Sequence, residues 1–382
     1  MLNLDEVLKS AREQTQLPDP DQDSWRTGLE LLLQDHRKVD ILNELGWQLL
    51  KANYIRALSA RMKVDDYLRR HPDLATKPVR RPVFILGMPR TGTTVVSYLM
   101  GADPKVRSLL KWEAYDGVPP AAPGALKSDP RCLAEKAKDE MIIRANPKGV
   151  AQHFEAGDGP TECVHLLAQD FRSLMFAVMS STPDYHDWLM NCDMTTAFTH
   201  RKRVFQVLQA TNQGRWVLKM PSDALFVQAL FQTFPDAKVI WTHRDPYVAF
   251  ASSMSMRTHA REIFNRDADL PYMRDHFPTQ LGLHLSRPLE MSAQRPRDFF
   301  HVYYDDLVTD PLGQMQDIYA WLGDPWTPEV QASMTAWLQD NPQGRFGTHT
   351  YSLEQWGIPR ADLTPYFADY LQAHPKAVTG RL

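Results

Sequence analysis

The segment 86–94, LGMPRTGTT, combines glycine, hydroxyl and guanidinium groups at a spacing that suits anion binding. Gly87 and Gly92 stand five positions apart, which is the glycine spacing of the nucleoside-triphosphate P-loop GxxxxGK[ST]. A short apolar run precedes the segment and a helical pattern begins at Thr93, so the segment connects a buried strand to a helix. Backbone N–H groups at the start of such a helix can cradle an oxyanion. The sequence therefore predicts a phosphate-binding loop.

The loop departs from the triphosphate-binding pattern at one position. Thr93 follows the second glycine, where the P-loop has the lysine that contacts the β- and γ-phosphates. This difference argues against an ATPase or a kinase. Arg90 lies inside the loop instead, and its planar guanidinium can bind an oxyanion through several donors. We expect the anion to be bound by Arg90, Thr91, Gly92, Thr93 and Thr94.

A second group of polar residues follows the apolar run 238–242. Asp245 and Pro246 are typical of a helix N-cap and first helical position, which places Arg244 at the carboxyl end of a strand. Open parallel sheets bind their ligands at that end. Ser252 follows on the same helix, and an arginine with a serine suits a phosphate that carries no metal. We find no carboxylate cluster in the sequence and predict no metal site.

The elements that must position these residues are short apolar runs alternating with helical patterns. The strand candidates are 82–87, 216–218, 238–242 and 299–303. The alternation predicts an α/β fold, a P-loop-type parallel sheet flanked by helices. Residues 40–70 carry apolar positions at helical spacing. We therefore expect a helical N-terminal cap over residues 1–78 and an α/β domain over 79–382.

The charge balance restricts the class of partner. The chain has 382 residues, with 43 Lys and Arg against 46 Asp and Glu, so the formal net charge is −3. This balance argues against a nucleic-acid binder, which normally carries a basic surface. Between Lys77 and Thr94, however, the chain carries only cations and no acid. We expect this segment and Arg244 to form a cationic pocket for one small polyanion.

The spacing of the cysteines and the length of the apolar runs indicate in which cellular compartment the protein is expected. Three cysteines without paired or ligand spacing predict neither a disulfide framework nor a zinc site. The N-terminus lacks a basic region followed by an apolar one, so we predict no secretory signal. No apolar run approaches the roughly 18 residues of a membrane span. We expect a soluble, cytoplasmic protein.

Several segments together resemble the sulfotransferase family, in particular its bacterial branch with the loop PRTGTT. Further matches in the expected order are WVLKMP at 216–221, FPDAK at 234–238, YDDLV at 304–308 and RFGTHTYSL at 345–353. The resemblance covers roughly residues 23–357. It implies an enzyme that moves a sulfuryl group from 3′-phosphoadenosine 5′-phosphosulfate (PAPS) to a hydroxyl or amine, with adenosine 3′,5′-bisphosphate as the second product.

The resemblance also implies roles for individual residues. The loop would hold the 5′-phosphosulfate, with Arg90 stabilising charge on the leaving oxygen, and Arg244 and Ser252 would bind the 3′-phosphate. Tyr304 and Arg345 fall in the matched segments and are expected to contact the nucleotide. Positioned donors of this kind supply much of the catalysis in such transfers.

Three residues are candidates for the general base. His153 titrates near neutrality without assistance and is the first choice. Asp223 stands where related members carry a histidine, although it could instead cap a helix. Glu162 lies in a segment similar to a PxEC stretch of the family, although it too could belong to a helix cap. The sequence leaves these alternatives open.

The acceptor is expected beneath the segments 111–124 and 257–275 and beside the apolar stretch 171–179. Their aromatic and methionine content suggests a small hydroxylated and apolar molecule, such as a lipid, steroid, phenol or polyketide. Homo-oligomerisation is left open. Two other functions also stay open: an atypical P-loop kinase, because of the glycine spacing, and a catalytically silent nucleotide-binding protein, because no base stands out.

Overall fold

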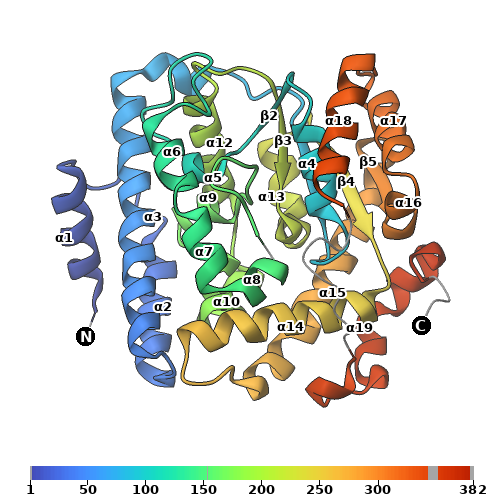
Figure 1. Cartoon of the computed structure of the whole chain (residues 1–382). Helices are drawn as coiled ribbons and strands as arrows, with labels where there is room; N and C mark the ends of the chain where they lie inside the picture. Colours follow the sequence, from blue (N-terminus) through green and yellow to red (C-terminus); the bar gives the residue numbers. More distant parts are fainter. Residues whose placement is uncertain (1, 153, 343–351, 379–382) are drawn as a thin grey trace.

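A five-stranded, wholly parallel sheet forms the centre of the molecule, in the order β2-β3-β1-β4-β5. It is seen in a computed structural model that describes residues 2–152, 154–342 and 352–378 (Figure 1). The strands are β1 (Val83–Gly87), β2 (Val106–Ser108), β3 (Arg215–Lys219), β4 (Lys238–His243) and β5 (Phe299–Tyr303). The predicted α/β fold is confirmed.

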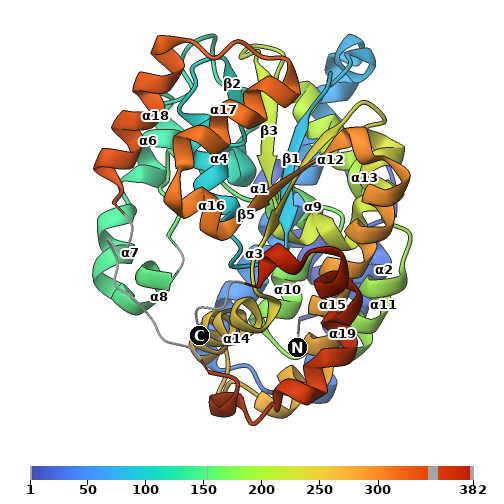
Figure 2. The same ribbon diagram turned by 90° about the vertical axis from the view of Figure 1, so that its right-hand side faces the viewer.

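Alternating residues of the strands build two cores. Phe84 and Leu86 of β1 point into the larger core, whereas Val83 and Ile85 point into the smaller one on the opposite face. Every residue of β1 is buried, which explains its continuous apolar sequence. Helices α17 and α18 lie on one face of the sheet and α12, α13 and α15 on the other (Figure 2).

Helices make up most of the remaining chain. None of those that the structure describes is long and apolar enough to cross a membrane. The helices of at least five residues are α1 (Leu4–Thr15), α2 (Arg26–Val39), α3 (Glu44–Arg70), α4 (Thr93–Gly101), α5 (Lys111–Asp116), α6 (Pro130–Lys136), α7 (Asp139–Ala145), α8 (Pro147–Gln152), α9 (Val164–Ala168), α10 (Leu174–Met179), α11 (Pro183–Asn191), α12 (Thr195–Leu208), α13 (Val227–Thr233), α14 (Pro246–Phe264), α15 (Leu270–Gln294), α16 (Tyr304–Thr309), α17 (Pro311–Leu322), α18 (Pro328–Asp340) and α19 (Arg360–Ala373), with the 3-10 turns η1 (Pro72–Thr76) and η2 (Pro221–Phe226).

The N-terminal helices pack directly against the rest of the molecule. Residues of α1, α2 and α3 belong to the same buried apolar cluster as one face of the sheet. A Cβ atom on Gly46 of α3 would lie 1.9 Å from the carbonyl oxygen of Phe264, so only glycine allows α3 to approach the end of α14 this closely. The buried Arg61 of α3 also pairs with the buried Asp170 at 2.7 Å. The core is therefore continuous across residue 78.

Candidate active site

The segment predicted to bind phosphate connects β1 to α4, as the sequence indicated. Arg90 and Gly92 both have left-handed backbone, with φ of 73° and 97°. The Thr91 hydroxyl donates to the carbonyl oxygen of Met88 at 2.7 Å and lies 2.6 Å from the Thr242 hydroxyl. The buried Thr91 hydroxyl therefore stabilises the loop internally and attaches it to β4. The hydroxyls of Thr93 and Thr94 and the backbone N–H groups are then the groups that can bind an anion.

Four of the residues predicted to bind a nucleotide come together beside the loop. The Nε of Arg90 donates to the Ser252 hydroxyl of α14 at 3.1 Å. Nη1 of Arg244, which directly follows β4, donates to the Arg90 carbonyl oxygen at 3.0 Å. The Arg244 guanidinium also lies 4.1 Å from the centre of the Tyr304 ring, directly after β5. The carboxyl ends of three adjacent strands thus contribute to one cationic centre.

The cationic segment ahead of the loop does not contribute as a whole. Arg81 precedes β1 and therefore lies at the amino end of the sheet, where its backbone N–H binds Asp236 and its guanidinium binds the Leu322 carbonyl oxygen. Lys77 and Arg80 precede it in the chain, before the strand begins. The expectation of a pocket built from the segment 77–90 is therefore wrong: β1 separates these cations from Arg90.

A cavity of about 630 Å³ opens from the loop. Its charged end contains Pro89, Arg90, Gly92, Thr93, Thr94, Arg244 and Tyr304. Its walls come from α7, α8, α10 and α14, which gather below the loop in Figure 1. Most wall residues are apolar: Ile142, Val150, Phe154, Leu174, Met175, Val178, Met179, Met256, Ala260, Ile263 and Phe264. A polyanion and a largely apolar molecule can therefore occupy opposite ends of one space.

Two carboxylates of the cavity lining, Glu155 and Glu162, share one buried lysine. Lys219, fully buried at the end of β3, donates to Glu155 at 2.9 Å and to Glu162 at 3.0 Å. Burial alone would lower the pKa of Lys219, but the two carboxylates outweigh this effect and hold the pKa above its ordinary value. Glu155 also accepts from the Thr161 hydroxyl at 2.5 Å. Glu162 is the more accessible carboxylate, with 23% of its side chain exposed.

The three candidates for the base have different positions. Glu162 lines the cavity, whereas Asp223 is absent from its lining. The turn η2 directs Asp223 toward α12, where both carboxylate oxygens accept from Nη1 of Arg201, at 2.8 and 2.9 Å. Both partners are buried. Asp223 is therefore neither a base in the cavity nor a helix cap, and this expectation is corrected. His153 lies outside the described residues, as does Arg345.

The sequence did not single out several residues that line the cavity. His165 follows Glu162 by three positions, packs edge-on against Tyr115 at 4.8 Å and also faces the cavity. Burial lowers the pKa of His165 to about 3, with nearby Arg56 acting in the same direction, so the imidazole is neutral near pH 7. Lys111 and Arg257 also belong to the lining. No recognisable spacing marks these residues, because they come from separate helices.

The comparison with known proteins decides the family. A profile of the Sulfotransferase family matches residues 82–328, which include the sheet and the phosphate-binding loop. The chain belongs to the sulfotransferase family. The crystal structure of sulfotransferase STF9 from Mycobacterium avium is 38% identical, with a TM-score of 0.91 over 98% of this chain and 97% of that one. Sulfotransferase STF1 from Mycobacterium tuberculosis is 30% identical, with a TM-score of 0.84 over 96% and 99%.

A further relative of this sulfotransferase has a name that includes its acceptor. The omega-hydroxy-beta-dihydromenaquinone-9 sulfotransferase Stf3 from Mycobacterium bovis is 24% identical over 293 residues, which are 72% of this chain and 71% of that protein. Together these relatives confirm the predicted family and enzyme class. This sulfotransferase therefore transfers a sulfuryl group from a donor to an acceptor.

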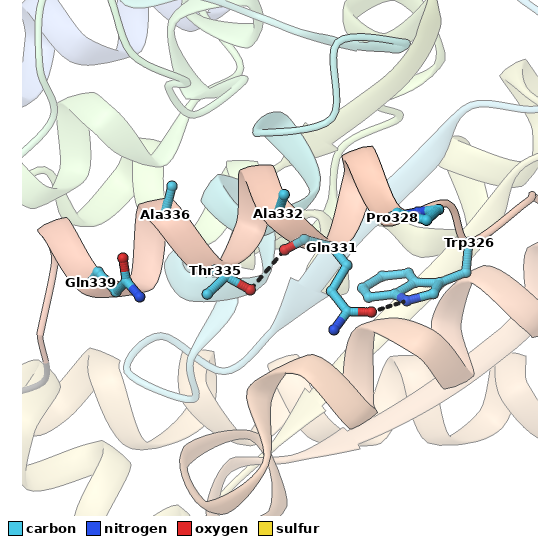
Figure 3. A pocket seen from close by; sticks show the side chains of 7 residues that line it. All are labelled: Trp326, Pro328, Gln331, Ala332, Thr335, Ala336 and Gln339. Atoms are coloured by element: carbon cyan, nitrogen blue, oxygen red, sulfur yellow. Dashed lines mark hydrogen bonds between the residues drawn. The ribbon is translucent and has the colours of Figure 1, made fainter.

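This sulfotransferase also has a shallow hollow on the outside of α18, with a volume of about 520 Å³ (Figure 3). Its lining residues carry no charge: Trp326, Pro328, Gln331, Ala332, Thr335, Ala336 and Gln339. The Trp326 indole donates to the side-chain oxygen of Gln331 at 3.2 Å and so is already satisfied. A hollow without cations does not suit an anionic sulfuryl donor, whereas the cavity beside the loop contains Arg90 and Arg244 and is the candidate active site.

Proposed function

We propose that this sulfotransferase takes the sulfuryl group from PAPS and transfers it to a hydroxyl group of a small, largely apolar molecule. The observation that carries the proposal is the single cavity that joins Arg90 and Arg244 to apolar walls on α10 and α14. A cationic end suits a nucleotide with two phosphate positions, and apolar walls suit a hydrophobic acceptor. The name of the relative Stf3, with a hydroxyl on a long apolar quinone, supports this class of acceptor.

In this proposal, different residues beside the loop bind the 5′-phosphosulfate and the 3′-phosphate of PAPS. The backbone N–H groups at the start of α4 and the hydroxyls of Thr93 and Thr94 face the position for the 5′-phosphosulfate. Arg244 and Ser252 provide a guanidinium and a hydroxyl for the 3′-phosphate, and the Tyr304 ring supports Arg244. When bound, PAPS supplies a sulfuryl group on a good leaving group. In this proposal the chain's residues orient that group and exclude water around it.

Glu162 accepts the proton of the acceptor hydroxyl in the proposed reaction. The hydroxyl oxygen forms a bond to sulfur, while the bond between sulfur and the bridging phosphate oxygen breaks. The electron pair of that bond stays on the phosphate oxygen, where Arg90 stabilises the developing negative charge. The products are the sulfated acceptor and adenosine 3′,5′-bisphosphate, and the proton remains on Glu162. A positioned base of this kind contributes about 10²–10⁴-fold to such a reaction.

Lys219 is a positioning residue in this proposal. It contacts Glu162 at 3.0 Å and holds this carboxylate of the cavity lining in place. Glu155 shares Lys219 but is also bound by Thr161, so it has less capacity to accept a proton.

Two measurements test the proposal. Calorimetric titration should show that adenosine 3′,5′-bisphosphate binds, whereas Mg·ATP binds much more weakly because the loop lacks the P-loop lysine. Transfer of labelled sulfate from PAPS should then be screened over hydroxylated lipids, steroids and phenols. The proposal fails if the bisphosphate does not bind at millimolar concentration. Transfer of a phosphoryl group from ATP at a comparable rate would support a kinase instead.

A further inference from the structure

A buried arginine interrupts the apolar wall of the cavity. Arg257 lies on α14, and its neighbours on the same wall are Met256, Ala260 and Phe264. Only 3% of the residue's surface is exposed, although its side chain is part of the cavity lining. A guanidinium at this position faces the half of the cavity that is otherwise suited to hydrocarbon.

This guanidinium has no anionic partner among the residues that the structure describes. Its Nε is a buried donor without an acceptor. Its contact within the protein is the Phe277 ring of α15, whose centre lies 4.3 Å from the guanidinium carbon. The charged or titratable groups around it are Tyr272, Arg261 and His284, none of which is a carboxylate. Arg261 differs from Arg257, because it donates to the Ala268 carbonyl oxygen and to the Ser181 hydroxyl.

A buried and unpaired charge requires compensation. Burial lowers the pKa of Arg257 to about 10, while Tyr272 acts in the opposite direction, so the side chain stays charged near pH 7. Buried charges in proteins are normally paired and hydrogen-bonded. An aromatic face compensates a cation only in part. The compensating group must therefore come from the open side, which is the cavity.

The position of Arg257 assigns this group to the acceptor and not to the donor. Arg257 follows Ser252 by five residues, which is about 7.5 Å along the helix axis and roughly 140° around it. Ser252 contacts Arg90 at the phosphate end, whereas Arg257 shares its face of α14 with Ala260 and Phe264. A planar guanidinium with parallel donors matches a carboxylate in particular.

We propose that Arg257 anchors a carboxylate subsite in the acceptor half of the cavity. The acceptor then carries a carboxylate in addition to an apolar body and the hydroxyl that receives the sulfuryl group. This inference rests on the proposed function, because it places the acceptor at the apolar end of the cavity.

The test compares a matched acid and ester in the presence of saturating adenosine 3′,5′-bisphosphate. The probes are 12-hydroxydodecanoic acid and its methyl ester, which differ only in the charged group. Calorimetry with the wild-type protein should show that the acid binds at least tenfold more tightly than the ester. Arg257→Met should reduce the affinity for the acid to that for the ester and leave the ester unchanged. Arg257→Lys should keep part of the preference.

A control variant distinguishes this role from the effect of replacing any partly buried arginine. Arg287 of α15 donates to the carbonyl oxygens of Leu225 and Met190 and is not part of the cavity lining. Arg287→Met should therefore keep the preference for the acid. The comparison of acid and ester in the wild-type protein needs no variant, so it stays decisive even if Arg257→Met does not fold.

Three results would overturn the inference. They are equal binding of acid and ester by the wild-type protein, no binding of the acid, and a loss of bisphosphate affinity in Arg257→Met that matches the loss for the acid. The third result would place Arg257 at the donor. A titration with bisphosphate alone distinguishes a failure of this inference from a failure of the proposed function. If the bisphosphate binds but the acid is not preferred, the inference fails and the proposed function stands.

Discussion

Arg90 combines an unusual backbone with a side chain that faces the phosphate end of the cavity. A non-glycine residue at φ of 73° is uncommon and is found where the surroundings over-determine the conformation. Here the Arg90 carbonyl oxygen accepts from Arg244, and its Nε donates to Ser252. The same residue therefore links the loop to Ser252 and Arg244, the two residues proposed to bind the 3′-phosphate.

Replacement of Arg90 should affect turnover more than nucleotide binding. We expect Arg90→Ala to lower kcat by about 10²–10³-fold, the usual loss when one preorganised donor is removed from a developing charge. The affinity for adenosine 3′,5′-bisphosphate should fall less, because this product no longer carries the transferred group. Steady-state kinetics and calorimetry measure the two effects. Unchanged turnover with weakened bisphosphate binding would contradict the role.

Glu162 can be tested by removal of its charge alone. Glu162→Gln keeps the shape of the side chain and should lower kcat by about 10²–10⁴-fold, with little change in bisphosphate affinity. Lys219→Met should also reduce kcat, because Glu162 then loses the ammonium group that holds it in position. A wild-type kcat in Glu162→Gln would argue against Glu162 as the base.

Asp223→Asn is the matched control for these variants. Because it leaves the buried Arg201 without its carboxylate, we expect it to lower the free energy of unfolding by about 3–5 kcal/mol. Turnover per folded molecule should stay within a few-fold of the wild type. A large loss of kcat at unchanged stability would instead restore Asp223 as a candidate base.

At the scale of elements, the sequence indicated the strands with apolar runs, including the edge strand β5, but not β2 at the opposite edge of the sheet. Strands β1, β3, β4 and β5 all contain runs of apolar residues, whereas β2 has the sequence Val-Arg-Ser. Its buried Arg107 pairs with Glu113 of α5, a contact that no local pattern reveals. Asp223 could not be placed for the same reason, since Arg201 lies on another helix.

The sequence predicted the part of the candidate site that lies within recognisable motifs. It did not predict the part in which residues from distant helices come together. The loop residues and Arg244 follow the carboxyl ends of β1 and β4, which are neighbours in the sheet, so their proximity follows from a parallel sheet. The walls come from short helices such as α7 and α10, which share no motif. Arg257 escaped notice because its significance depends on the lack of an anionic partner among the described residues, which only a structure displays.

Helix α19 rests on the sheet through neutral histidines, which makes its packing sensitive to acid. His374, at its end, stacks on His243 of β4 with ring centres 4.3 Å apart. Burial and, to a smaller extent, His301 lower the pKa of His374 to about 4. Unfolding releases this group to an ordinary pKa of about 6.5. Folding thus favours the neutral imidazole.

Stability should therefore fall as the pH falls from about 6.5 to about 4, because the unfolded chain then binds protons that the folded chain excludes. Urea unfolding at pH 7 and pH 5 measures the effect. His374→Gln should reduce this pH dependence by up to about 1.4 kcal/mol per pH unit, the contribution of one proton. An unaltered pH dependence in the variant would show that other buried histidines carry the effect.

At the scale of the whole molecule, the N-terminal helices and the sheet share one core. Arg61 and Asp170 connect α3 to the segment after α9, and both side chains are buried. Asp170 also accepts from Arg172 and from Thr196 of α12. The boundary expected near residue 78 is thus crossed by both apolar packing and a buried ion pair.

This continuity predicts one cooperative unfolding transition for the full chain. Asp170→Asn should lower the free energy of unfolding by about 3–5 kcal/mol, since it leaves Arg61 buried and unpaired, and the transition should remain single. Glu140→Gln, which removes an exposed partner of Arg144, should leave stability nearly unchanged. Differential scanning calorimetry and urea titration provide the measurements. Two separated transitions would indicate that the helical cap unfolds on its own.

Helix α14 has a consequence for how such an enzyme could diverge. Its second turn holds Ser252 at the proposed donor end, and its last turn holds Ile263 and Phe264 at the proposed acceptor end, about 18 Å further along the same helix axis. Substitutions in the last two turns can therefore alter acceptor choice without disturbing the donor machinery. Residues 256–264 of α14 are therefore the part of this helix to randomise when a new acceptor is sought.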